Sequence, residues 1–197
     1  MRDGLQQAAQ ALAQRDGVTR DIAIFCAAAL IFILAAEWLL ALVWRWARLT
    51  RASVARMALV GLVAYLVSKA LTGLIVDPRP YIVAHAHPLI PLPRDNGFPS
   101  DHTLLAALLT ASLWWIDRRL APVFMVGTLL VMLGRLAVGA HHTEDVVGSV
   151  VIVAVAALGA AALRVPLAWD RPLLRARTPA REPTRHDAMI DGDGRGA

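Results

Sequence analysis

Residues 54–76 read VARMALVGLVAYLVSKALTGLIV, and this run decides the fold class. Its length is close to the ~20 apolar residues that an α-helix needs to cross a bilayer, and its only charged residues are Arg56 and Lys69. Further apolar runs lie on both sides of it, at 21–44, 103–116, 121–138 and 146–165. We therefore predict an all-α fold, a polytopic membrane helical bundle of about five transmembrane helices.

The composition supports this class. Hydrophobic residues make up 57% of the 197-residue chain, more than a soluble domain of this size can usually cover with a wetted surface. The basic residues that give the net charge of +5 lie between and after the apolar runs, so we expect no nucleic-acid partner. Cys26 is the single cysteine and lies inside an apolar run, which excludes a disulfide framework.

The chain divides into three parts by composition. The N-terminal segment 1–20 is polar and does not resemble a cleavable signal peptide; residues 5–12 within it could form a short interfacial helix. A transmembrane domain is expected over 21–168. The tail 169–197 is rich in Arg, Pro, Asp and Gly, and we expect it to be disordered.

Arginines alternate sharply between the connecting segments. They follow the first, third and fifth runs: Arg45, Arg48, Arg51, Arg56, Arg118, Arg119, Arg164, Arg171, Arg175, Arg177, Arg181 and Arg185. The positive-inside rule places these segments and the C-terminus in the cytoplasm. Segments 77–102 and 139–145 then lie outside, and they hold nearly all of the chemically interesting residues.

Two cations stand out near the outer end of the second run. Lys69 is the only lysine and lies within the membrane helix, where it either snorkels to the interface or faces a phosphate. In Asp77-Pro78-Arg79-Pro80, two prolines fix the backbone around Arg79, which suits a guanidinium held for bidentate phosphate binding. The alternative is an interfacial arginine paired with Asp77.

The stretch Gly97-Phe98-Pro99-Ser100-Asp101-His102 comes directly before the third run. Ser100 is a natural N-cap, and the free amides of the first helical turn can bind an anion. His102 would lie beside that anion and could exchange a proton with it near neutral pH. The alternative is helix capping next to a surface histidine.

The strongest local signal is Arg135 followed by His141 and Asp145. The last two are four residues apart at the start of the fifth run, hence on one face if helical. A carboxylate that binds one imidazole nitrogen leaves the other free as nucleophile or base, whereas the alternative is a salt-bridged helix end. Because three separate stretches place arginines and histidines on the same side of the membrane, we predict a phosphate site there that needs no metal.

These residues resemble the signature of the type 2 phosphatidic acid phosphatase superfamily. Its three elements are present as Lys69…Arg79-Pro80, Pro99-Ser100-Asp101-His102 and Arg135…His141…Asp145. The surrounding stretches look most like the BcrC-type undecaprenyl pyrophosphate phosphatases of bacteria. The resemblance covers roughly residues 68–153, and more loosely all five spans.

The resemblance implies a metal-independent hydrolysis without a cofactor. His141 would attack the terminal phosphorus and become a phosphohistidine, Asp145 would orient it, and His102 would protonate the leaving phosphate. The remaining motif residues would bind the substrate: Arg79, Ser100, Arg135, Lys69, Pro80 and Asp101. The implied reaction converts undecaprenyl pyrophosphate to undecaprenyl phosphate at the outer face of the bacterial cytoplasmic membrane, in the recycling of a cell-wall carrier lipid.

The chain departs from the family pattern at three positions. Thr72 stands where the family lysine is usual, with Lys69 one turn earlier. Asp101 replaces a glycine, and Gly134 replaces the serine before the third-motif arginine.

Other functions are open on the sequence alone. Another lipid phosphate, such as phosphatidylglycerol phosphate or phosphatidate, could be the substrate, and the phosphate could be transferred rather than hydrolysed. Five histidines in the outer segments make a membrane metal- or haem-binding protein an alternative of a different class, although two arginines would repel a cation. A transporter is disfavoured because the polar groups gather at one membrane face. The sequence predicts no oligomeric state.

Overall fold

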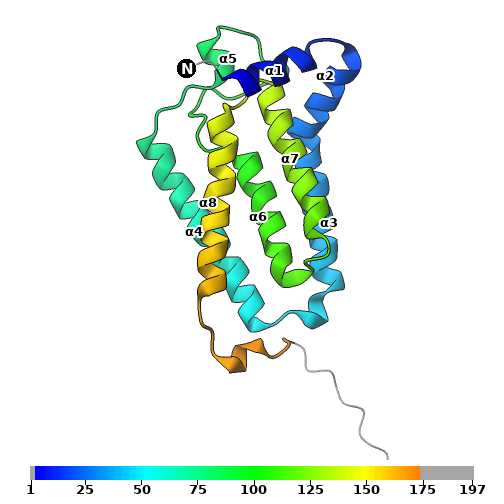
Figure 1. Ribbon diagram of the computed structural model, residues 1–197, viewed down its shortest axis with the longest axis vertical. Helices are drawn as coiled ribbons and strands as arrows, with labels where there is room; N and C mark the ends of the chain where they lie inside the picture. Colours follow the sequence, from blue (N-terminus) through cyan, green and yellow to red (C-terminus); the bar gives the residue numbers. More distant parts are fainter. Residues whose placement is uncertain (1–2, 174–197) are drawn as a thin grey trace, which may run out of the picture.

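The computed structural model describes residues 3–173, and this part of the chain is all-α, as predicted. The helices are α1 (Gly4–Ala13), α2 (Gly17–Ile24), α3 (Leu30–Trp44), α4 (Arg51–Leu74), α5 (Pro80–Val83), α6 (Asp101–Ile116), α7 (Ala121–Ala137) and α8 (Thr143–Ala162). The short π-helix η1 (Phe25–Ala29) joins α2 to α3. The 3₁₀ turns η2 (Trp46–Arg48) and η3 (Leu167–Asp170) lie near the end of the bundle that is remote from α1. Figure 1 shows the long helices running side by side, with α1 lying across one end.

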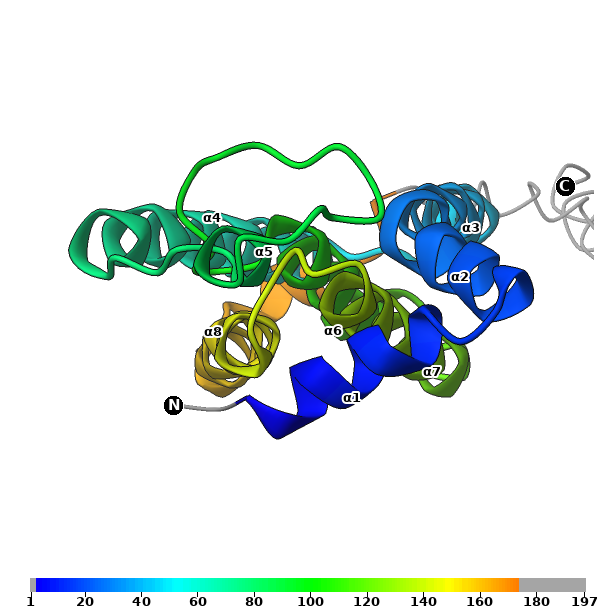
Figure 2. The same cartoon turned by 90° about the horizontal axis from the view of Figure 1, so that it is seen from above.

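Helix α6 is the centre of the bundle. It lies among α3, α4, α7 and α8 when the molecule is seen from above (Figure 2). One apolar cluster joins α6 to α3 and α7 through Leu34, Leu113 and Val131, and a second joins it to α4 and α8 through Leu104 and Val153. The interior is therefore packed on both sides of α6, which fixes where the first turn of this helix lies.

The outer surface is apolar, which confirms the membrane class. Phe32 is 72% exposed, Trp44 78% and Leu158 71%, and many other large apolar side chains also face outward. A water-soluble monomer rarely exposes so much contiguous apolar surface, whereas lipid tails cover it at no cost. The chain is a multi-pass membrane protein.

Three helical stretches are long and apolar enough to cross a bilayer: Gly17–Trp44, Arg51–Leu74 and Thr143–Ala162. Helix α7 is a shorter apolar helix. Helix α6 has 16 residues, so it spans about 24 Å and falls short of the ~30 Å hydrocarbon core, but its neighbours surround it. The full count of five spans stays a prediction.

The first long helix begins earlier than expected. Its start was predicted at residue 21, but the side chain of Asp16 accepts a hydrogen bond from the Thr19 amide at 2.8 Å and caps a helix that begins at Gly17. The short helix expected over 5–12 is present as α1.

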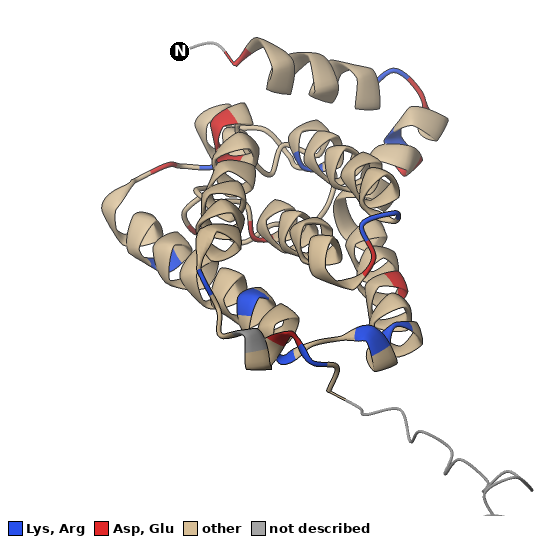
Figure 3. Ribbon diagram, turned by 60° about the horizontal axis from the view of Figure 1, so that its bottom comes forward, with Lys and Arg blue, Asp and Glu red and all other residues tan. Residues whose placement is uncertain are grey.

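The two ends of the bundle differ in charge. Figure 3 shows basic residues, all of them arginines, at the turn from α3 to α4, where Arg45 pairs with Asp117. At this end, residues 167–173 fold back onto the start of α4, and the Leu173 amide donates to the Leu49 carbonyl at 2.9 Å. The first residues of the expected tail are thus ordered against the bundle, and 174–197 lie outside the described residues.

Candidate active site

The predicted site residues, with one exception, gather at the end of the bundle opposite the basic turn. Here α4 ends, α5 and α6 begin, and the turn from α7 to α8 crosses between them (Figures 1 and 2). Pro80 is buried at the first position of α5, where its fixed φ suits a helix start, and the extended residue before it is Arg79. The chain therefore turns sharply and sends Arg79 inward.

Arg79 is buried and held on three sides. Its Nε donates to Asp95 Oδ1 at 2.9 Å, its NH1 donates to the Ala140 carbonyl at 3.0 Å, and the same NH1 lies 3.3 Å from Nε2 of His141. The ion pair is therefore with Asp95 and not with Asp77, which was the alternative read from the sequence. These contacts hold the guanidinium beside the imidazole.

His141 is the residue on which the site converges. Its Nδ1 lies 2.9 Å from the Gly97 carbonyl and 3.4 Å from Asp145 Oδ2, while its Nε2 faces the two arginines. Helix α8 begins only at Thr143, so His141 and Asp145 do not share a helical face as expected; the turn before the helix brings them together instead.

Arg135 closes the other side of the imidazole. It lies in the last turn of α7 and is 5% exposed; its NH1 donates to the Ala27 carbonyl at 3.2 Å and its NH2 lies 3.5 Å from Nε2 of His141. Burial, and then the charges of Arg135 and Arg79, lower the pKa of His141 to about 3. The imidazole is therefore neutral at pH 7, as a nucleophile requires.

Asp145 caps α8 and lies beside the nucleophile. Its Oδ2 accepts from the His142 amide at 2.8 Å, and its Oδ1 is buried with no hydrogen-bond partner among residues 3–173. Asp77 also has a buried oxygen, Oδ2, without such a partner. A Cβ built on Gly97 would lie 3.2 Å from an oxygen of each carboxyl group, so these two groups flank the same glycine.

The start of α6 supplies the third part of the site. Ser100 occupies the N-cap position, but its hydroxyl makes no capping bond and is buried without a partner among the described residues, which leaves it free for a ligand. Asp101 is exposed in the first turn. His102 is half-buried and within electrostatic reach of Arg135, His141 and Arg79.

Lys69 is the exception. Its side chain is exposed and lies over the Tyr65 ring, with 5.7 Å from Nζ to the ring centroid. The buried face of α4 runs through Ala64 and Ser68, one residue away from it. Lys69 therefore lies on the outward side of its helix, away from the other predicted site residues, and its contact with the substrate stays a prediction.

Some groups at the site were not predicted. The Gly97 and Ala27 carbonyls contact the catalytic side chains directly, and Asp95 and Asn96 hold the loop that carries one of them. A backbone acceptor leaves no signal in a sequence. The Asn96-Gly97 pair is a typical turn signal, which our prediction did not include, and it would not have shown to which groups the pair binds.

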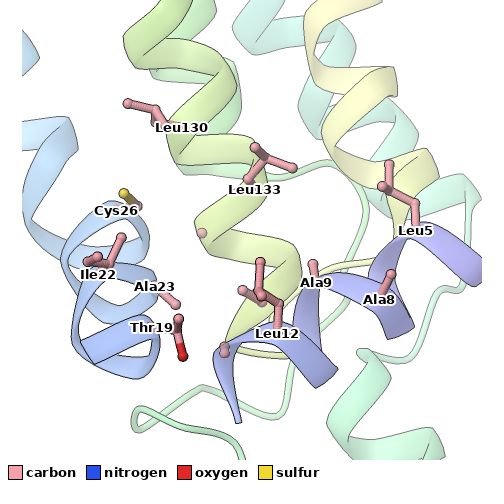
Figure 4. A pocket seen from close by; sticks show the side chains of 13 residues that line it. Leu5, Ala8, Ala9, Leu12, Thr19, Ile22, Ala23, Cys26, Leu130 and Leu133 are labelled. Carbon is pink, nitrogen blue, oxygen red and sulfur yellow. The ribbon is translucent and has the colours of Figure 1, made fainter. Parts of the chain in front are cut away.

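We call Arg79, Arg135, His141 and the start of α6 the cradle, and none of these residues lines the apolar groove beside α1. This groove of about 500 Å³ runs between α1, the α2–η1 helix and α7, and its lining is apolar: Leu5, Leu12, Ile22, Cys26, Leu133 and Gly134 are among the lining residues (Figure 4). Such a groove suits hydrocarbon and offers nothing to a phosphate. Within residues 3–173, no group of three or more His, Cys, Asp or Glu side chains is arranged to hold a metal ion.

Comparison with known proteins agrees with the geometry. Residues 50–169 match the family model of the PAP2 superfamily, and the chain belongs to that superfamily of phosphatases. It is 30% identical over 103 residues to the undecaprenyl-diphosphatase BcrC of Bacillus subtilis (strain 168), a match that covers 52% of this chain and 53% of that protein. The chain thus spans about half the length of this curated relative. No solved structure matches.

Proposed function

We propose that this protein hydrolyses undecaprenyl pyrophosphate to undecaprenyl phosphate and inorganic phosphate, through a phosphohistidine at His141. One observation carries the proposal: Nε2 of His141 lies 3.3 Å from Arg79 NH1 and 3.5 Å from Arg135 NH2, while Nδ1 is held by the Gly97 carbonyl. A neutral imidazole held between two guanidinium groups is suited to nucleophilic attack on the phosphorus of an anionic phosphate.

Substrate binding follows from the donors that surround Nε2. The guanidinium groups that now contact the imidazole can move their hydrogen bonds to the oxygens of a terminal phosphate, in the bidentate geometry that arginine favours. The free hydroxyl of Ser100 and the first amides of α6 can bind the remaining oxygens, because the start of a helix attracts anions.

In the first step, the lone pair on His141 Nε2 attacks the terminal phosphorus. A P–N bond forms, and the bond from this phosphorus to the bridging oxygen breaks. Burial, and then the charge of Arg135, lower the pKa of His102 to about 4 without substrate, and the negative charge of the bound pyrophosphate raises it again. His102 therefore takes up a proton as the substrate binds and donates it to the bridging oxygen, which leaves as undecaprenyl phosphate. The positive charge on the phosphorylated ring is stabilised by the Gly97 carbonyl at 2.9 Å and by Asp145 at 3.4 Å.

In the second step, water attacks the phosphorus of the phosphohistidine. His102, now neutral, takes a proton from the water, the P–N bond breaks, and its electron pair returns to Nε2. Inorganic phosphate leaves, His102 releases its proton as the negative charge departs, and both histidines recover their starting protonation. The site needs no other reactant.

The choice of substrate rests on the BcrC likeness and on the position of the site. The catalytic groups lie at one end of a membrane bundle, where a lipid can stay in the bilayer while its headgroup enters the cradle. Other lipid phosphates share this chemistry, so the assay must include them.

The test is phosphate release by the purified protein from undecaprenyl pyrophosphate, phosphatidylglycerol phosphate and phosphatidate, with and without chelator. We expect the highest kcat/KM with the pyrophosphate and no effect of chelator. His141→Ala should lower kcat by at least ~10³-fold, because it removes the nucleophile. Substrate labelled in the terminal phosphate should leave acid-labile label on the wild-type protein and none on the variant.

Glu144→Gln is the matched control, since Glu144 is exposed one residue before Asp145 and should retain full activity. Full activity of His141→Ala would refute the nucleophile assignment, and a higher kcat/KM with phosphatidate would refute the proposed substrate.

A further inference from the structure

We propose that Asn96 is a positioning residue for the nucleophile, an inference that builds on the proposed phosphatase reaction. Its side chain ties the loop before α6 to the end of α4, and this tie places the Gly97 carbonyl on Nδ1 of His141. Asn96 itself contacts neither the imidazole nor the cradle, so it would act only through its neighbour.

The side chain of Asn96 uses both ends of its amide. Its Oδ1 accepts from the Asp77 amide at 2.7 Å, and its Nδ2 donates to the Ile75 carbonyl at 2.6 Å and the Thr72 carbonyl at 3.1 Å. These two carbonyls belong to the last turn and the C-cap of α4, where helical carbonyls lack intrahelical partners. The Asn96 side chain therefore binds carbonyl groups at the end of α4 and also holds the backbone that follows this helix.

The backbone extends this grip to Gly97. The Gly97 amide donates to the Asp77 carbonyl at 2.7 Å, and Asn96 forms a backbone bridge with Pro78. A Cβ at position 97 would lie 3.0 Å from that carbonyl oxygen, so only glycine fits without a shift. The carbonyl of Gly97 is thus fixed from the α4 side and points at His141, 2.9 Å from Nδ1.

This contact decides which imidazole nitrogen carries the proton. A carbonyl can only accept, so Nδ1 must hold the hydrogen, and Nε2 then has the lone pair. The groups on the other side agree, because Arg79 and Arg135 can only donate to Nε2. Asp145 is the longer contact at 3.4 Å, and its Oδ2 already accepts from the His142 amide.

Asn96→Asp is the sharpest variant. It keeps the size and the acceptor for the Asp77 amide, but it replaces the donor to the Ile75 and Thr72 carbonyls with an oxygen that they repel. We expect kcat with undecaprenyl pyrophosphate to fall on the order of 10–100-fold, with KM within about twofold, because the cradle arginines stay in place. His87→Ala, exposed in the same loop, is the control and should match the wild type.

A second readout reports the proton directly. Nitrogen-15 spectra of histidine-labelled protein in detergent micelles, with the His141 signals identified by their loss in His141→Gln, should show a single Nδ1–H tautomer in the wild type. In Asn96→Asp this signal should split or move toward a mixture of tautomers. A purely structural role would lower yield or melting temperature without changing the tautomer of the folded fraction.

Wild-type His141 protonated at Nε2 would overturn the inference, and so would an Asn96→Asp variant with unchanged kcat and tautomer. If that variant fails to fold, Asn96→Ser takes its place, and the wild-type spectrum still decides which nitrogen Gly97 holds. If the wild-type protein releases phosphate from none of the lipids, the proposed phosphatase reaction is refuted. If Asn96→Asp nevertheless changes the tautomer of His141, the positioning role of Asn96 stands.

Discussion

The carboxyl group of Asp77 lies close to the carboxyl group of Asp145. Burial, and then the side chain of Asp145, raise the pKa of Asp77 to about 7, so at mildly acid pH it keeps a proton that the unfolded chain would have released. The stabilisation is complete below the unfolded value near 4 and is lost as the pH rises to about 7. The contribution of Asp77 to stability should therefore fall between about pH 4 and 7, whereas His141 and His102, with pKa values lowered to about 3 and about 4, contribute stability in the opposite direction as the pH rises toward 6.5.

Asp77→Asn tests this at the residue scale, because an amide keeps a hydrogen to share with Asp145 at every pH. We expect the melting temperature of the variant, relative to that of the wild type at the same pH, to rise between pH 4 and 7, as measured by unfolding in detergent. Asp16→Asn is the matched control, since that carboxyl group lies in α2's N-cap and is remote from the pair. A difference in melting temperature that stays constant between pH 4 and 7 would mean that the two carboxyl groups do not share a proton.

Gly134 sets the contact between two elements, α7 and the π-helix η1. A Cβ at this position would lie 2.6 Å from the Ala27 nitrogen and 2.7 Å from the Cys26 carbonyl carbon, both of them backbone atoms that cannot turn aside. The glycine therefore lets η1 approach α7 closely enough for Arg135 to donate to the Ala27 carbonyl. The serine usual in the family would place its Cβ against these backbone atoms.

Gly134→Ser should force η1 away from α7. The expected cost is about 1–3 kcal/mol of overpacking, seen as a fall of several degrees in melting temperature, together with reduced phosphatase activity because Arg135 loses its anchor. Gly61→Ser on α4 is the control: no atom outside its own helix lies within 4 Å of a Cβ there. A fully stable and active Gly134→Ser protein would contradict the proposed packing.

Lys69 and His141 show how much of the site could be predicted from the sequence. Apolar runs predicted the long helices, and the charge pattern of the connecting segments placed Arg79, Arg135 and His141 on one side of the membrane, where we predicted a shared site. The sequence could not give the direction of the lysine, because a residue's distance from a helix end does not say which side of the helix it faces: Ser68 is buried and Lys69, about 100° further round, is exposed. Gly97 was missed because its contact uses a backbone carbonyl.

The whole molecule has one end with the cradle and another with most of the arginines (Figure 3). By the positive-inside rule we propose that the arginine-rich end is cytoplasmic and the cradle lies outside, where a spent carrier lipid would be released. This orientation requires the loop after α5 to be external and the turn between α6 and α7 to be internal. A chain inserted the other way would carry out the same chemistry on the wrong side of the membrane.

Single cysteines can decide between the two orientations. In a Cys26→Ala background, Ala86→Cys in the external loop should react with a membrane-impermeant maleimide on intact cells, because residue 86 is exposed. Arg118→Cys, exposed in the turn after α6, should react only after the membrane is permeabilised. The opposite labelling pattern would place the cradle in the cytoplasm and would remove extracytoplasmic lipid recycling as its role, while leaving the phosphatase chemistry of His141 untouched.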